Sequence, residues 1–457
     1  MFSFLENAST ILIAPAGWRA RFASGVVFSL VAAVFNAGST FAVNVAIANF
    51  LGRETFGEFA IVLNTLLTIA NVAALGTGLT VTKYVAEFRS VDRDKAGRIM
   101  ALCTAIATLM GSLLAITLLV GAPWLARLAL SEPQLTLGLR LTAVVVFFNV
   151  TNFVYSGVLA GLEAYPALAK AGVISGTAYL LACVAGAYVG GRDGALAGLA
   201  ISVGVQWLTL RFFWRRECAR QRIVADYGRM GAEREAILKF ALPAALSGLS
   251  SMPALWLANT ALVRQADGYA QWALYAAAAN LRVTALFLPT LLNSVGMSLL
   301  NNARGLGDRG RYRKVYGGNL AMAGGVTLTG AVGMALVGPA LLSFFGRGFE
   351  GGYPVLVVLL VSTLFEALTM AVRQVVQSHG KMWLSLFILA LPRDGLIVLL
   401  AYKLTPAYGA VGLALAYTAG WGLVLILNTI AAWHLGWGMW GETPSSTGTP
   451  SGDAASR

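Results

Sequence analysis

The stretch Glu54-Thr55-Phe56-Gly57-Glu58-Phe59 has a counterpart in Asp267-Gly268-Tyr269-Ala270-Gln271-Trp272. Each hexapeptide follows one long apolar run and precedes the next. Six such runs fill residues 20–215, and six more fill residues 236–432 in the same order. An internal repeat of this kind dictates the architecture, because each half must form the same structural unit.

Gly, Pro and Asn residues of the two halves occupy corresponding positions at an offset of about 215 residues, as a repeat requires. Gly38 aligns with Pro253, Asn44 with Asn259, and Gly76 lies close to the position of Pro289. In membrane transporters, paired Gly and Pro interruptions in corresponding segments indicate a transport site between the halves. We therefore expect hinges at Gly38, Pro253, Gly76 and Pro289.

The composition identifies a membrane protein. Hydrophobic residues make up 58% of the 457 residues and charged residues 12%, and the mean hydropathy is +0.72. Runs of about 20 residues suffice to cross the bilayer core as helices. The sequence predicts an all-α polytopic protein with twelve spans, at residues 24–50, 56–81, 99–121, 135–161, 167–189, 194–214, 237–262, 272–300, 316–345, 354–378, 382–402 and 408–432.

Basic residues are distributed unequally between the two sides of the membrane. Twenty-three Lys and Arg lie in the termini and the even-numbered connections, against six in the odd-numbered ones. Cytoplasmic loops carry the excess of Lys and Arg, so both termini are expected in the cytoplasm. The net charge of +13 follows from this bias, and no nucleic-acid partner is expected.

The repeat also predicts the domain boundaries. Residues 1–213 form an N-terminal six-helix bundle, and residues 237–440 form a C-terminal one. The basic connection 214–236 is predicted as an amphipathic helix on the cytoplasmic surface, because its charges surround Trp214 and Ile223. Residues 441–457 have the composition of a disordered tail.

Two motifs resemble a known family. Phe50-Leu51-Gly52-Arg53 leads into Phe56-Gly57-Glu58-Phe59, and Leu75-Gly76-Thr77-Gly78 leads into the basic Thr82-Lys83-Tyr84-Val85-Ala86-Glu87. The pattern resembles the opening of O-antigen-type oligosaccharide and polysaccharide flippases, in the multidrug/oligosaccharidyl-lipid/polysaccharide exporter superfamily.

The resemblance implies two bundles related by a pseudo-two-fold axis along the membrane normal, with a cavity between them and alternating access by rocking. It implies an undecaprenyl-pyrophosphate-linked glycan as substrate, moved across the bacterial inner membrane for polysaccharide or lipopolysaccharide biosynthesis. Expected partners are this glycan, membrane lipids, and polysaccharide polymerase and chain-length proteins.

Ionisable residues near the middle of a span are costly and mark functional sites. Arg282, Glu366, Arg393 and Asp394 lie near the centres of their spans. A guanidinium binds phosphate oxygens in bidentate fashion, so we expect Arg282 to anchor a pyrophosphate head group, with Arg393 second. The resemblance implies that the span carrying Arg282 lines the cavity, and no acidic residue lies one turn away in its own helix, so we expect Arg282 to face the cavity. Alternatively, Arg282 bonds backbone carbonyls or a carboxylate within its own bundle.

The carboxylates allow two readings. The helices that carry Glu366 and Arg393 are consecutive, so a Glu366–Arg393 ion pair inside the bundle is expected, without contact to substrate. Alternatively, Glu366 or Asp394 couples transport to a proton or cation.

Asparagine stripes run along several spans. Asn36 and Asn44 share one helix face with Thr40, Asn64 and Asn71 follow on the next span, and Asn259 and Asn280 repeat the pattern in the second half. Such faces form either interhelical hydrogen bonds or a sugar-facing cavity wall.

Two other classes compete with a flippase. A drug or cation antiporter of the same superfamily relies on carboxylates, whereas an unpaired cationic residue favours an anionic substrate. A membrane polymerase or glycosyltransferase needs large loops or catalytic carboxylate motifs, and the chain has neither. No Walker-type loop, metal site or cofactor motif is present, so we expect no enzymatic activity.

Overall fold

The computed structural model describes residues 18–74, 76–234, 242–305, 309–378 and 385–438. The predicted tail at 441–457 lies outside them. In the described part, nine helices of 22 residues or more form the fold: α2 (Trp18–Ala74), α4 (Arg93–Trp124), α5 (Thr136–Gly161), α6 (Tyr165–Gln221), α8 (Leu242–Val263), α9 (Gly268–Gly305), α10 (Arg309–Ser343), α11 (Tyr353–Ser378) and α13 (Leu391–Gly438). Seven helical segments of the described chain are long and apolar enough to cross a membrane.

Three of these helices contain a break. Non-helical backbone angles occur at Gly52 in α2, at Gly190 and Gly191 in α6, and at Gly409 in α13. The breaks divide the nine helices into twelve arms, consistent with the twelve spans predicted. The protein is an all-helical polytopic membrane protein.

The breaks repeat between the halves. Gly52 and Asp267 both have positive φ, 79° and 54°, and so do Ser131 and Gly346; both pairs fit the offset of about 215 residues deduced from the sequence. Gly191 (φ 59°, ψ −139°) and Gly409 (φ 53°, ψ −130°) adopt almost the same conformation. Corresponding turns thus have corresponding backbone geometry.

Shorter elements connect the helices. The short helix α3 (Thr77–Phe88) follows α2, and Gly76 stands before it in the left-handed region with φ 65°. The span predicted at 56–81 is therefore not one continuous helix. A π-helical turn, η1 (Leu125–Ala129), and a 3-10 turn, η2 (Pro133–Leu135), join α4 to α5; the 3-10 turn η5 (Glu350–Gly352) precedes α11, and the π-helical turn η6 (Ser385–Ala390) runs into α13.

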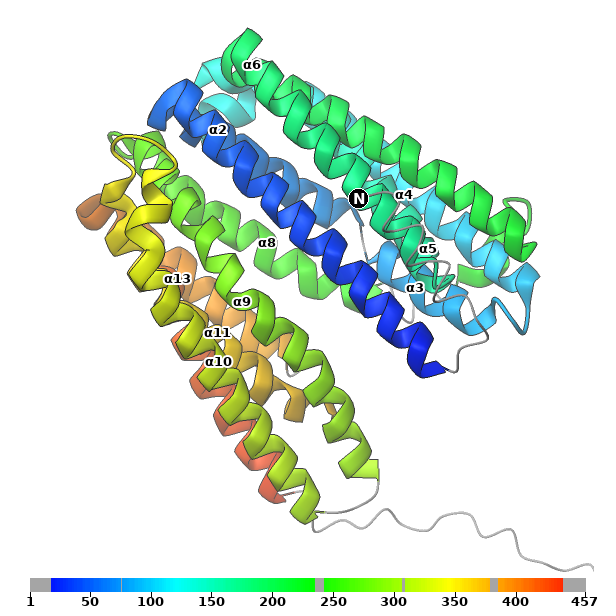
Figure 1. Ribbon diagram of the computed structural model, residues 1–457. Coiled ribbons are helices and arrows are strands. Elements are labelled where there is room, and N and C mark those ends of the chain that lie inside the picture. The colour runs from blue at the N-terminus through cyan, green and yellow to red at the C-terminus, as the bar shows by residue number, and fades with distance from the viewer. Residues whose placement is uncertain (1–17, 75, 235–241, 306–308, 379–384, 439–457) are drawn as a thin grey trace, which may run out of the picture.

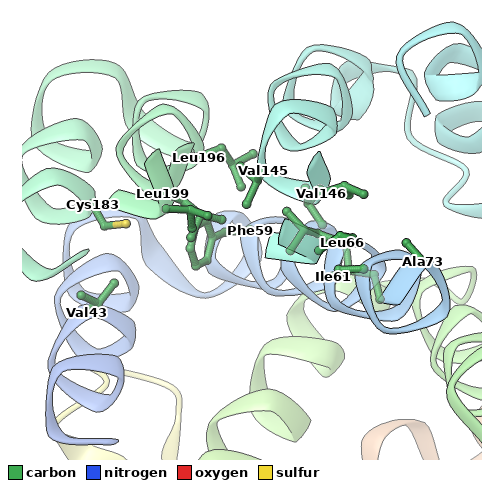
Figure 2. Packing of buried hydrophobic residues seen from close by; sticks show 14 of the residues in the cluster. Val43, Phe59, Ile61, Leu66, Ala73, Val145, Val146, Cys183, Leu196 and Leu199 are labelled. Atoms are coloured by element: carbon green, nitrogen blue, oxygen red, sulfur yellow. The ribbon is translucent and has the colours of Figure 1, made fainter. Parts of the chain in front are cut away.

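The first half packs around an apolar core. Figure 1 shows α2 to α6 gathered in one bundle and α8 to α13 in another. In the first, buried side chains of α2, α5 and α6 meet, among them Phe59, Val145 and Leu196 (Figure 2). Small residues let the helices approach closely: a Cβ on Gly198 would lie 2.1 Å from the carbonyl oxygen of Ala182.

The connection between the halves differs from the prediction. Residues 214–221 continue α6, which ends at Gln221, and the capping residue Arg222 is in the left-handed conformation (φ 56°). Residues 222–229 are not helical, and a 3-10 turn, η3, covers Met230–Glu233. The amphipathic helix predicted for 214–236 is therefore wrong over residues 222–229, because backbone contacts to α4 hold this segment in an irregular path. The main-chain N–H of Asp226 donates to the carbonyl of Gly97 at 3.4 Å.

The bundles meet at one end, which we call the joined end: residues 49–57 of α2, the turn 130–131, the start of α9 at 268–269 and the segment 344–349. The Asn49 amide donates to the Phe344 carbonyl at 2.5 Å, and the Tyr269 hydroxyl donates to the Leu130 carbonyl at 2.6 Å. The rings of Phe56, Phe345 and Phe349 pack together there, and the ring of Phe41, farther along α2, contacts that of Phe345.

Away from the joined end, the bundles diverge. Figure 1 shows the start of α2 and the last turns of α9 far apart, with α10 beside α9 on the outer side. The arrangement is a V whose apex is the joined end. The charge bias of the loops predicts that this apex faces the periplasm.

Labelling tests this orientation. Val91, in the turn between α3 and α4, is 83% exposed, and Val189, at the break in α6, is 86% exposed. With the native cysteines replaced, Val189→Cys is expected to react with a membrane-impermeant maleimide in intact cells, and Val91→Cys only after the inner membrane is permeabilised. Reaction of Val91→Cys in intact cells would show that the predicted orientation is wrong.

Candidate functional site in the C-terminal bundle

A buried ion pair joins α9 to α11. A guanidinium nitrogen of Arg282, Nη1, lies 2.9 Å from Oε2 of Glu366. Both residues are 8% exposed. Arg282 also donates through Nη2 to the hydroxyl of Tyr417 on α13, at 3.2 Å. Because an isolated charge at membrane depth is expensive, this pairing offsets part of the cost of burying the two side chains inside the bundle.

A second charged cluster joins α13 to α8. Arg393 Nε lies 2.8 Å from Asp394 Oδ1, and its Nη2 donates to Ser251 Oγ at 2.7 Å. The Ser251 hydroxyl is also 2.8 Å from Asp394 Oδ2. Asp394 is 2% exposed. The π-helical turn η6 immediately precedes this cluster, and such turns are frequent at functional sites.

Two aromatic rings connect the clusters. The Arg282 guanidinium lies 4.8 Å from the centre of the Tyr417 ring, and the Arg393 guanidinium lies 4.8 Å from the centre of the Trp421 ring. The two rings are neighbours, with centroids 6.2 Å apart. Cations over aromatic faces gain electrostatic stabilisation, more so when desolvated. The result is one network from Glu366 to Ser251, with two positive and two negative charges.

The structure corrects two expectations about these residues. Glu366 pairs with Arg282 and not with Arg393, whose carboxylate partner is its chain neighbour Asp394. Arg282 points to α11 and α13 of its own bundle, and the expectation that it is unpaired and faces a central cavity is wrong for this conformation. The alternative, a carboxylate partner within the bundle, is confirmed for Arg282. The identity of that carboxylate was not predicted, because α9 packs directly on α11, which is not its neighbour in the chain.

The asparagine stripes meet between the halves. Asn259 Nδ2 donates to Asn64 Oδ1 at 3.1 Å, and the neighbouring Trp256 indole donates to Thr65 Oγ1 at 2.8 Å. These bonds link α8 to the second arm of α2. For this pair, the interhelical reading of the stripes is confirmed.

The other asparagines have different surroundings. Asn44 is buried at 4%, whereas Asn36 and Asn71 are exposed. Asn71 and Asn280 donate to carbonyls one turn back in their own helices. Contact of any of them with a sugar stays a prediction.

The predicted hinges lie in different backbone environments. Gly76 stands at the break between α2 and α3. Pro253 and Pro289 lie inside α8 and α9, where each removes one backbone donor. Gly38 has helical angles within α2. Motion at these positions stays a prediction.

Three residues of the network were not predicted from the sequence: Ser251, Tyr417 and Trp421. Tyr417 and Trp421 are four residues apart on α13 and therefore share a helix face. That spacing, on the helix arm that follows the one carrying Arg393, was the available signal. Ser251 had none, since a serine in a membrane helix is ordinary.

Comparison with known proteins agrees with this architecture. Residues 22–300 match the polysaccharide biosynthesis protein family. The chain belongs to this family.

Two relatives span almost the whole chain. The EPS I polysaccharide export inner membrane protein EpsE of Ralstonia nicotianae is 25% identical over 427 residues, which cover 91% of this chain and 94% of that protein. Its counterpart from Ralstonia solanacearum is 25% identical over 430 residues, with the same coverage.

Solved structures share the fold. An inward-facing multidrug resistance MATE transporter of the MOP superfamily superposes with a TM-score of 0.75 at 18% identity, over 90% of this chain and 98% of that chain. An outward-facing structure gives 0.69 at 19% identity, over 93% and 97%. The chain thus combines the sequence pattern of this family with the fold of these transporters.

The buried pair predicts a specific pattern of stability. Arg282→Met or Glu366→Leu alone leaves an uncompensated buried charge, and each is expected to lower the free energy of unfolding by about 3 kcal/mol. The double variant removes both charges and should recover most of that loss. Denaturation in mixed micelles measures the three values. A double variant as unstable as the sum of the singles would show that the two side chains do not act as a pair.

Proposed function

We propose that this protein moves an undecaprenyl-pyrophosphate-linked glycan from the cytoplasmic to the periplasmic leaflet of the bacterial inner membrane, for polysaccharide or lipopolysaccharide biosynthesis. The observation that carries the proposal is the relation to polysaccharide export proteins over 91% of the chain. The basic loops support an orientation with both termini in the cytoplasm.

The contacts between the halves support alternating access. The joined end is held by a small set of bonds and rings around Phe345, and Gly57 makes the approach possible. A Cβ on Gly57 would lie 1.9 Å from the Tyr269 carbonyl oxygen. In this proposal the substrate enters between the diverging arms on the cytoplasmic side, and rocking then parts the joined end.

Arginine exchange couples substrate to the network in this proposal. An incoming pyrophosphate competes with Glu366 for Arg282, and with Asp394 for Arg393, because each guanidinium can bind phosphate oxygens in bidentate fashion. A carboxylate that loses its arginine becomes a site for a proton or cation. Arg282 and Arg393 are thus the proposed head-group contacts, and Glu366 and Asp394 the proposed coupling groups.

A drug or cation antiporter is the alternative. The sequence argument against an antiporter relied on an unpaired arginine. Because Arg282 is paired with Glu366, that argument no longer distinguishes an antiporter from a flippase. The similarity to polysaccharide export proteins over 91% of the chain favours a glycan over a drug or cation as the substrate. Partners such as polymerase and chain-length proteins remain part of the flippase proposal.

Export assays separate the role of Arg282 in stability from its role in transport. In a strain that lacks the gene, Arg282→Lys should retain the fold but export glycan several-fold more slowly, because an ammonium lacks the planar fork. The Arg282→Met/Glu366→Leu double variant should accumulate in the membrane and export less than a tenth of the wild-type amount, since no phosphate ligand remains at this position.

The control is Arg140→Gln, which removes an exposed arginine from α5 of the other bundle and should leave export unchanged. Wild-type export by the stable double variant would exclude Arg282 as a head-group contact. Failure of the wild-type gene to restore glycan export, with drug efflux intact, would support the antiporter.

Cross-linking tests motion at the joined end. Asn49→Cys with Phe344→Cys, in a background without native cysteines, places two thiols where the Asn49 amide now contacts the Phe344 carbonyl. A short cleavable bis-thiol reagent should stop export, and cleavage of the reagent should restore it. Asn49→Cys alone, treated in the same way, is the control. Undiminished export by the cross-linked protein would contradict rocking at this end.

A further inference from the structure

Four arginines line one pocket at the end of the N-terminal bundle opposite the joined end. The pocket has a volume of about 360 Å³. The turn between α3 and α4 contributes Arg89, Ser90 and Arg93, and the end of α6 contributes Arg220, Gln221 and Arg222. Two segments separated by more than a hundred residues therefore converge on one basic concavity.

The acids around the pocket neutralise it only in part. Arg89 pairs with Glu163 at 2.5 Å, and Arg220 lies 3.8 Å from Glu217. Within the described part of the chain, Arg93 and Arg222 form no ion pair with a carboxylate.

Two carboxylates near the pocket have other partners. Asp92 accepts from the main-chain N–H of Lys95 and caps α4. Glu233 pairs with Arg98 at 2.8 Å. The six residues that line the pocket carry four positive charges and no negative charge. Like charges brought together repel one another, so a bound anion would stabilise this arrangement.

Packing holds the arginines in this arrangement. The Val224 carbonyl approaches Gly97 so closely that a Cβ there would lie 2.0 Å from the oxygen. Arg222 adopts the left-handed conformation, uncommon for a residue with a side chain. The Gln221 amide donates to the Leu162 carbonyl at 3.2 Å, and Ile223 is 3% exposed. The main chain that carries Arg222 is therefore fixed by packing, which distinguishes this pocket from a loop that is merely rich in arginine.

We propose that this pocket binds a phosphoryl anion at the cytoplasmic face. A planar guanidinium matches phosphate oxygens in geometry as well as charge. Basic pockets on the cytoplasmic side of helical bundles suit phospholipid head groups, and free phosphate presents the same oxygens. The site belongs to the N-terminal bundle and does not depend on the proposed function or on the buried network.

The test compares a pocket variant with a matched control. Arg93→Gln with Arg222→Asn removes the two unpaired guanidiniums, and asparagine tolerates the left-handed backbone at 222. Arg229→Gln with Arg234→Gln removes the same charge from two exposed positions of the same connection that do not line the pocket. Full-length proteins are placed in phosphatidylcholine nanodiscs with or without phosphatidylglycerol, and native mass spectrometry counts the retained lipid. Calorimetry with inorganic phosphate in pure phosphatidylcholine discs is the second arm.

The pocket variant should bind the anion roughly tenfold more weakly than wild type, and the control should bind within about twofold, because hydrogen bonds to charged partners carry most of the affinity. Loss of phosphatidylglycerol retention alone identifies a lipid head group, and loss of phosphate binding identifies a free anion site. Equal binding of both anions by the wild-type protein and the pocket variant would overturn the proposal.

Discussion

The contact between the bundles at the joined end determines what the rest of the structure can do. There a side-chain amide, a few main-chain carbonyls and four phenyl rings hold two halves of almost two hundred residues each. Gly57 lets its own main chain lie directly against the main chain of Tyr269, so the interface is closely packed there. In the proposed function this contact separates without unfolding either bundle. The arms beyond it diverge, which leaves the asparagine pair Asn64–Asn259 as a polar contact between the halves.

A second constraint shapes the C-terminal bundle. Charge inside a membrane has to be matched, and the bundle matches two arginines with two carboxylates and two aromatic faces. This arrangement holds two guanidinium groups inside the bundle without adding net charge. In the proposed function, an anionic substrate competes with the carboxylates for these two groups. The N-terminal bundle has a different arrangement, with its concentration of arginine at the end that the charge bias assigns to the cytoplasm. The two halves thus share a backbone plan and differ in where they place charge.

The backbone plan could be predicted from the sequence because it depends on local chemistry. Gly52 with Asp267, and Ser131 with Gly346, mark turns at matching positions, and long apolar runs form helices wherever lipid surrounds them. The partner of Glu366 could not be predicted in the same way. It depends on how far α9 and α11 rotate about their own axes, and those rotations follow from packing over many residues.

The connection between the bundles shows the same limit. Its amphipathic pattern favoured a surface helix, but close approach of Val224 to Gly97 and the Arg98–Glu233 pair hold it against α4 instead. Periodicity describes which face of a helix would be apolar. Periodicity carries no information about Gly97 on α4, whose missing side chain lets the main chain at Val224 approach.

The central claim is that the two ends of the V open and close reciprocally as substrate is moved. Pulsed electron resonance can follow both ends in the reconstituted protein, with spin labels at Val91 and Gly318 on the diverging arms and, in a second sample, at Leu128 and Arg347 beside the joined end; all four positions are exposed. With lipid-linked glycan extracted from the host, the first distance should shorten and the second should lengthen, relative to lipid alone. Distances that stay unchanged, or that move in the same direction at both ends, would contradict the account.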